Sequence, residues 1–251
     1  MNIAASVSKH VNALHSGIWL ARPKHIEWLL LLVFGTGLPL YAMNAGVGQI
    51  AADLLFIMLF VWLVVRGDYF ERYILIASLL ISAAGEGFLS LIWGLYDYKF
   101  HTVPFCVPPG HALFMMSGVL ASRKMPECIA WLTPLVALPF VIYGLYQGTD
   151  TADIVLYLIF TLFIIFARAR RFYATMFIFS LILEIVGTRL GVWAWRPIVP
   201  GTGFTSSNPP LCAGSFYCML DFLVLGSLSM FNTLLDNRAG TYAKLPQIDI
   251  T

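Results

Sequence analysis

The chain has 251 residues, of which 59% are hydrophobic and only 11% are charged, and its formal net charge is +2. Soluble domains carry about 25% charged residues, and the mean hydropathy of +0.82 lies far from that class. Composition therefore excludes an ordinary soluble domain and indicates a polytopic membrane protein. The small net charge gives no sign of a nucleic-acid partner.

Eight hydrophobic segments follow one another along the chain, each near the ~20 residues that a helix needs to cross a bilayer. The fourth is short. We therefore predict an all-α membrane protein with about eight transmembrane helices. The predicted spans are 27–43, 46–65, 70–93, 107–122, 128–146, 151–167, 172–192 and 210–232.

Basic residues are distributed unevenly among the predicted loops. Cytoplasmic loops carry the excess of Lys and Arg, so this bias predicts that both termini are cytoplasmic. The expected location is the inner (plasma) membrane of a bacterium. The expected cytoplasmic side holds Lys9, Arg22, Lys24, Arg66, Arg72, Arg123, Lys124, Arg168, Arg170, Arg171, Arg238 and Lys244, the other side holds Lys99 and Arg196, and Arg189 falls within a span.

Two stretches about a hundred residues apart repeat the same order of residues. An even number of spans in each unit would give both units one orientation, related by an axis along the membrane normal. We therefore predict two parallel four-helix repeats, residues 1–122 and 123–251. The matched features are Asp53 and Asp153, Glu86 and Glu184, Gly94 and Gly191, Tyr96-x-Tyr98 and Trp193-x-Trp195, Val103-Pro104 and Val199-Pro200, and Pro108-Pro109 and Pro209-Pro210.

The paired acids are the best candidates for function, because an ionisable group inside a membrane is costly. Glu86 lies seven residues before the outer end of its predicted span, about 10 Å deep. The acids are alternatively an internal hydrogen-bonded pair, the aromatic residues an interfacial belt, and the aspartates helix-start residues. The expected substrate-binding residues are Tyr96, Tyr98, Trp193, Trp195, Asn208 and Asp53.

Residues present in only one repeat are further candidates, because an asymmetric reaction needs different groups on its two sides. Aligning the Pro-Pro pairs sets His111 opposite Cys212, Asn208 opposite Val107 and Asp221 opposite Leu120. Histidine exchanges protons near neutral pH. An Arg189 ion pair would keep Glu184 ionised and leave Glu86 as the protonated acid. The expected catalytic residues are Glu86, Glu184, His111, Arg189 and Asp221.

The segment 184–191 (EIVGTRLG), followed by Trp193 and Trp195, resembles the Glu, Gly-Thr, Gly and Tyr-x-Tyr pattern of integral-membrane carotenoid-biosynthesis proteins, and residues 86–108 resemble the same stretch. These hydratase and lycopene cyclase-like proteins are helical. The resemblance implies proton-initiated hydration or cyclisation of a polyene by membrane carboxylates, without a redox cofactor. Where the lycopene cyclases place paired glutamates after the Val-Pro, this chain has Pro109-Gly110-His111 and Pro210-Leu211-Cys212.

Other chemistries lack their motifs in this sequence. It contains no His-Glu-x-x-His, histidine-box array, Gly-x-Ser-x-Gly, Walker loop or Asp-rich prenyl-diphosphate motif, so neither a metal nor another cofactor is expected. Cys106 and Cys212 both fall on the outer side, where a disulfide between them is the alternative to free thiols.

Three functions remain open at the level of sequence. The first is a lipid or isoprenoid hydratase, cyclase or isomerase that takes its substrate from the non-cytoplasmic half of the bilayer. The second is a proton-coupled transporter. The third is a noncatalytic protein that binds a lipid or a cofactor such as a porphyrin, with His111 as a ligand. The expected partners are the membrane and a lipid or isoprenoid substrate, without nucleic acid, and the oligomeric state stays open.

Overall fold

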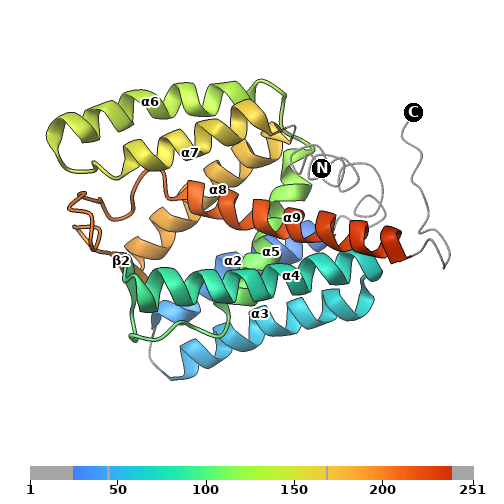
Figure 1. Ribbon diagram of the computed structural model, residues 1–251. Helices are drawn as coiled ribbons and strands as arrows, with labels where there is room; N and C mark the ends of the chain where they lie inside the picture. The colour runs from blue at the N-terminus through green and yellow to red at the C-terminus, as the bar shows by residue number, and fades with distance from the viewer. Residues whose placement is uncertain (1–24, 44–45, 168, 239–251) are drawn as a thin grey trace.

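The computed structural model describes residues 25–43, 46–167 and 169–238 (Figure 1). Each of the eight predicted spans is a helix in this part of the chain, and Lys9, Arg22, Lys24, Arg168 and Lys244 lie outside the described residues. The elements are α2 (His25–Met43), α3 (Val47–Arg66), α4 (Tyr69–Glu86), the π-helix η2 (Gly87–Ile92), β1 (Tyr96–Tyr98), α5 (Val107–Ser122), α6 (Ile129–Gln147), α7 (Asp153–Phe166), α8 (Arg170–Arg189), β2 (Trp193–Trp195) and α9 (Gly214–Arg238).

Six of these helices are long and apolar enough to cross a membrane: α2, α3, α4 with η2, α6, α8 and α9. The other two are shorter than the expected spans. The 16 residues of α5 reach about 24 Å and the 14 residues of α7 about 21 Å, whereas the hydrocarbon core is about 30 Å thick. The membrane class predicted from the composition is confirmed to the extent that six helices are long and apolar enough to cross a membrane, whereas the prediction was of eight spans.

The helices form a central group of four with a pair on each side. In the centre α4 packs on α5 and α9, and α8 packs on the same two helices. The α2–α3 pair lies along one side and the α6–α7 pair along the other (Figure 1). Most residues of α5 are buried, as expected for a helix that is apolar on all sides.

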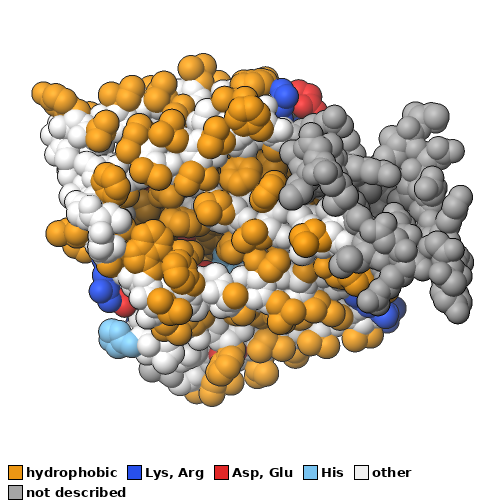
Figure 2. All heavy atoms as spheres, in the orientation of Figure 1, with side chains coloured by type: hydrophobic (Ala, Val, Ile, Leu, Met, Phe, Trp, Pro, Cys, Tyr) orange, Lys and Arg blue, Asp and Glu red, His pale blue; other side chains and the backbone are white. Residues whose placement is uncertain are grey.

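The outer surface of the bundle is apolar. Large hydrophobic side chains are exposed along the outer helices, including Trp28, Leu80, Trp131 and Phe140, and orange side chains cover most of the face in Figure 2. A continuous apolar surface of this extent suits contact with lipid rather than water. The buried polar residues, among them Glu86, Glu184 and Asp221, lie inside.

The two ends of the bundle differ in charge and structure. One end, called the strand end here, carries β1, β2 and the long connections, including Lys99 and Arg196. The opposite end, called the basic end, carries the turns that follow α3, α5 and α7 (Figure 1). The basic residues at the end of α3, at the start of α4, in the turn after α5 and at the start of α8 belong to this end. They are Arg66, Arg72, Arg123, Lys124, Arg170 and Arg171.

The strands β1 and β2 pair antiparallel across the middle of the strand end, with Tyr96 opposite Trp195 and Tyr98 opposite Trp193. Asp97 lies opposite Ala194 at the centre, so each strand presents the same relative positions to the other. The guanidinium of Arg196, the residue after β2, donates hydrogen bonds to the Asp97 carboxylate at 3.1 and 3.2 Å. This contact raises the pKa of the exposed guanidinium.

The same reciprocity continues into the segments beside the strands. The backbone N–H of Lys99 donates to the carbonyl of Val192, and that of Arg196 donates to the carbonyl of Leu95. A glycine precedes each strand in the left-handed region, Gly94 at φ 74° and Gly191 at φ 68°. Glycine is favoured there because it lacks the Cβ that would clash. Both helices therefore turn into their strands in the same way.

The π-helix η2 accounts for a one-residue difference between the two stretches. Glu86 precedes Gly94 by eight residues, whereas Glu184 precedes Gly191 by seven. The extra residue lies where the chain is a π-helix, Gly87–Ile92; α8 remains α-helical to Arg189. A π-bulge accommodates an inserted residue within an α-helix. Both acids can thus face their own strand despite the unequal spacing.

Candidate functional site

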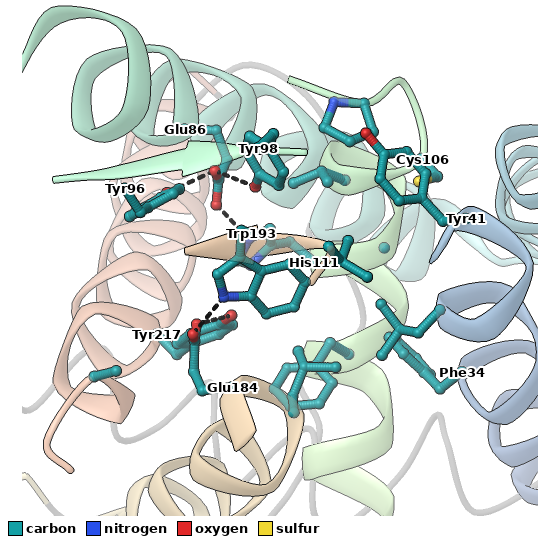
Figure 3. Close-up of a pocket in the computed structure, with 18 of the residues that line it drawn as sticks. Phe34, Tyr41, Glu86, Tyr96, Tyr98, Cys106, His111, Glu184, Trp193 and Tyr217 are labelled. Carbon is teal, nitrogen blue, oxygen red and sulfur yellow. Dashed lines mark hydrogen bonds and ion pairs between the residues drawn. The ribbon is translucent and has the colours of Figure 1, made fainter. Parts of the chain in front are cut away.

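Glu86, the last residue of α4, is buried beneath β1 and lies within hydrogen-bonding distance of three side chains (Figure 3). The phenols of Tyr96 and Tyr98 donate to its Oε2 at 2.6 and 2.7 Å. Nε2 of His111, on α5, lies 2.8 Å from its Oε1. Burial, followed by the nearby Glu86 charge, raises the pKa of both phenols well above the ordinary tyrosine value. Both phenols therefore remain donors.

Glu184, on α8, has a matching set of three donors. The indole Nε1 atoms of Trp193 and Trp195 lie 2.7 and 2.8 Å from its Oε2. The phenol of Tyr217, on α9, donates to its Oε1 at 3.0 Å. Each acid is thus held by two aromatic residues of its own strand and by one ring from the helix that follows.

The third partners of the two acids, His111 and Tyr217, meet in the middle of the site. Their ring centroids are 5.0 Å apart, with the planes tilted by 31°. Figure 3 shows the two acids on opposite sides of the site, with His111 and Tyr217 between them. The Glu184 group contains only neutral donors, whereas the Glu86 group contains a histidine. The two halves of the site are alike in geometry and different in chemistry.

Two aspartates bind the backbone before the helices that carry these rings. Oδ1 of Asp53, on α3, accepts the N–H of Cys106 at 2.8 Å, and Oδ1 of Asp153, on α7, accepts the N–H of Cys212 at 2.9 Å. Both cysteines are free thiols, so the disulfide considered above is not formed. Asp53 does not line the cavity described below; it fixes the start of α5.

Matching the chain by these aspartate contacts corrects the Pro-Pro alignment. Cys106 and Cys212 then occupy matching positions, and five residues later come His111 and Tyr217. The alignment by prolines fails because the segment between β2 and Cys212 is longer than the one between β1 and Cys106. His111 therefore matches Tyr217 and not Cys212. Tyr217 was missed for this reason, and counting from the repeated cysteines would have found it.

Besides Asp53, three of the expected site residues lie outside the two groups of side chains around the glutamates. Arg189 is exposed at the end of α8 and forms no ion pair with Glu184 in the described part of the chain, because five residues along a helix turn it about 140° away. Asp221 is buried on α9 near Tyr173, away from the cavity. Asn208 accepts the backbone N–H of Trp195 at 2.9 Å, which positions β2. The basic side chain in contact with a glutamate is thus His111, at Glu86, and not Arg189, at Glu184.

The two clusters form the walls of a small cavity of about 80 Å³ between the central helices and α2. Its lining includes both glutamates, the two tyrosines of β1, the two tryptophans of β2, His111 and Tyr217; the remainder is mainly apolar. Figure 2 shows a hollow in the apolar face, with acidic and histidine surface at its base. Glu86 and Glu184 thus come together with the aromatic residues of both strands around one space, whereas Asp53 and Asp221 do not line it.

A second, larger opening adjoins this cavity. It is a groove of about 470 Å³ between α2, α5 and α8. Phe34, Leu38, Phe114 and Leu183 line both spaces. This groove was not predicted, because most of its lining residues are ordinary apolar helix residues.

Comparison of the chain with family models, curated proteins and solved structures finds no match. Among the described residues, no group of three or more His, Cys, Asp or Glu side chains is placed to hold a metal ion. The function must therefore be argued from the geometry of the site itself.

Proposed function

We propose that the chain is a membrane-embedded enzyme that acts on an apolar lipid or isoprenoid by acid–base chemistry. The observation that carries this proposal is the Glu86–His111 pair at the wall of an apolar cavity. A carboxylate that binds one nitrogen of histidine orients the ring and leaves the second nitrogen for the reaction. The closest chemical analogue is the proton-initiated hydration, cyclisation or isomerisation implied by the resemblance to carotenoid-biosynthesis proteins.

His111 is the proposed group for proton exchange, with Glu86 as its positioning residue. Because Glu86 Oε2 already accepts two phenol hydrogens, we assign the carboxylate as ionised and the hydrogen in the Glu86–His111 contact to Nε2. His111 contacts Glu86 through Nε2, and its side chain lines the cavity. Nδ1 is then the atom that meets the substrate. This assignment replaces the expected role of Glu86 as the acid itself.

The proposed reaction begins when the protonated His111 gives the hydrogen on Nδ1 to one carbon of an alkene. The double bond becomes a C–H bond and a carbocation at the neighbouring carbon. The faces of Trp193, Tyr217 and the other aromatic residues stabilise such a cation, as does Glu184. In isomerisation or cyclisation the cation returns a proton to Nδ1; in hydration a water molecule supplies hydroxide to carbon and its proton to Nδ1.

Two further features belong to the same proposal. The matching hydrogen bonds, the reciprocal strand pair and the two glycine turns support two parallel four-helix repeats, 1–122 and 123–251, derived from one unit. All eight helices, including α5 and α7, would then cross the inner membrane of a bacterium, with the basic end and both termini cytoplasmic. The acid site then lies toward the non-cytoplasmic half of the bilayer.

The test is deuterium incorporation by purified protein in lipid nanodiscs. Polyenes and isoprenoid alcohols are incubated in deuterium oxide, and the recovered lipid is analysed by mass spectrometry. We expect deuterium on carbon with the wild type, and loss of incorporation with His111→Asn. His101→Asn is the matched control, since His101 lies at positive φ in an exposed loop. Equal incorporation by the wild type and His111→Asn would refute the assignment.

Extraction of lipid bound to the purified protein gives a second test. An enzyme of this class is expected to retain a specific apolar lipid, whereas a proton-coupled transporter of polar solutes would carry only the bulk phospholipid. Retention of a specific lipid, with no deuterium incorporation into any of the substrates, would instead favour a noncatalytic binding protein.

A further inference from the structure

The sizes of the two adjoining spaces limit which part of a lipid can lie in each. Sites for small molecules usually measure about 300–1,000 Å³. The acid cavity, at about 80 Å³, is too small to hold a whole lipid, whereas the groove, at about 470 Å³, lies within the usual range. If the reacting atoms of a lipid lie beside His111, most of the molecule must therefore lie in the groove.

The groove adjoins the cavity, and the residues that line both spaces are apolar. Phe34 and Phe114 belong to both spaces, and their ring centroids are 5.5 Å apart in an edge-on contact. In Figure 3 Phe34 lies on the far side of the pocket from Glu86. A hydrocarbon chain that passes these two rings from the groove would thus reach the acids with its end first.

The groove extends from the cavity to the basic end of the bundle. There Lys124 forms an ion pair with Glu27, and both residues line the groove. Between that ion pair and the shared residues, Ser117 is the one polar side chain of the lining. From Glu27, which lines the groove, to Tyr41, which lines the cavity, α2 rises by fourteen residue steps, or about 21 Å. The outer rim includes Leu31 and Ile182, which are exposed, so a chain can enter from the surrounding lipid.

We infer that the groove holds the hydrocarbon chain of an elongated lipid, with the chain terminus inserted into the acid cavity. This inference rests on the proposed function and makes it more specific: the enzyme acts at the end of the chain and not at its middle. A polar head group, where the substrate has one, lies near Glu27 and Lys124. Hydrocarbon chains much shorter than about 21 Å leave part of the groove and cavity empty.

Gly35 provides a way to obstruct the groove without disturbing the packing. It lines the groove, and a Cβ placed there meets no atom within 4 Å. A Cβ at Gly226, on α9, likewise meets nothing within that distance, and Gly226 lines neither space. Gly35→Phe and Gly226→Phe are therefore a matched pair, and Ser117→Phe obstructs the groove from α5.

The experiment uses a long polyprenyl alcohol that carries a diazirine at its head, with a monoterpene alcohol carrying the same group as the short probe. After irradiation in nanodiscs, labelled peptides are mapped by mass spectrometry. We expect the long probe to label the start of α2 and the end of α5, and Gly35→Phe and Ser117→Phe to reduce that labelling about tenfold, the loss that corresponds to about 1.4 kcal/mol. Gly226→Phe should label as the wild type does.

Failure of this inference is distinguishable from failure of the proposed function. Unchanged long-probe labelling in both obstructed variants, or labelling spread over the exposed face of α6, overturns the groove assignment. If His111→Asn still abolishes deuterium incorporation, the enzyme proposal stands alone. Labelling that the obstructions remove, in a protein that incorporates no deuterium, leaves a lipid-binding groove and refutes the enzyme. Thermal unfolding of all three variants at the wild-type temperature confirms that each is folded.

Discussion

At the scale of single residues, the chemistry of the site follows from which third partner each glutamate has. Both carboxylates accept two hydrogens from their own strand, and they differ in the ring that completes the set: His111 for Glu86 and Tyr217 for Glu184. A phenol and an imidazole of similar size can occupy matching positions, but only the imidazole exchanges protons readily near neutral pH. In the proposed reaction, therefore, only the Glu86 side of the site exchanges a proton with the substrate.

Asp221 illustrates a buried acid that we place outside the reaction. Its Oδ2 is buried and has no hydrogen-bond partner among the described residues. An unpaired buried polar group costs about 1–3 kcal/mol, and an amide avoids the cost of a buried charge. We predict that Asp221→Asn raises the free energy of unfolding by about 1 kcal/mol and retains deuterium incorporation. Thermal unfolding and the isotope assay measure both; a folded but inactive variant would restore Asp221 to the catalytic set.

Gly187 is required for contact between α8 and the strand that holds its acid. A Cβ at this position would lie 2.1 Å from the Trp193 ring, so alanine must displace the indole that binds Glu184. Overpacking of this kind costs about 1–3 kcal/mol. We predict that Gly187→Ala lowers the unfolding temperature and shifts the tryptophan emission, whereas Gly226→Ala does neither. An unshifted emission spectrum would show that the indole does not depend on this glycine.

At the scale of elements, the helices were predictable and their relative phase was not. Long apolar runs bounded by charge or glycine define the eight helices, because a chain in lipid must satisfy its backbone hydrogen bonds within a helix. Helix phase decides which side chains meet, and it is set by details that such runs do not show. The longer segment before Cys212 made Tyr217, and not Cys212, the counterpart of His111, and one inserted residue in η2 changed the spacing of Glu86 from its strand.

The π-helix supplies a prediction about deletion. Removing Leu91, which is 64% exposed in η2, gives Glu86 the same seven-residue spacing that Glu184 has. We predict that this variant keeps its fold and strand pair, with the π-helix converted to α-helix. Deleting Ile185 from α8 instead leaves six residues and rotates Glu184 by about 100° relative to β2. Expression and thermal unfolding should show severe loss only for the Ile185 deletion; equal loss in both would contradict the equivalence.

At the scale of the whole molecule, the acid cavity beneath the strand end adjoins an apolar groove that opens to the surface of the bundle. The paired strands hold both acids beneath the strand end, and the groove along α2 reaches toward the basic end. The composition predicted the membrane class, and the repeated acids predicted where polar chemistry gathers. The groove could not be predicted, since an apolar residue facing a cavity and one packed in a core look the same in sequence.

The proposed membrane crossing of the short helix α5 can be tested with a native cysteine. Cys128 is exposed just beyond α5 at the basic end, whereas the other three cysteines are buried. Lys99 lies before α5 at the strand end. We predict that a membrane-impermeant maleimide added to intact cells labels Lys99→Cys but not Cys128, and that Cys128 reacts once the membrane is opened. Because α5 is the one helix between the two positions, labelling of both from the same side would show that it does not cross. The strand end, and with it the acid site, would then have to be placed anew relative to the bilayer.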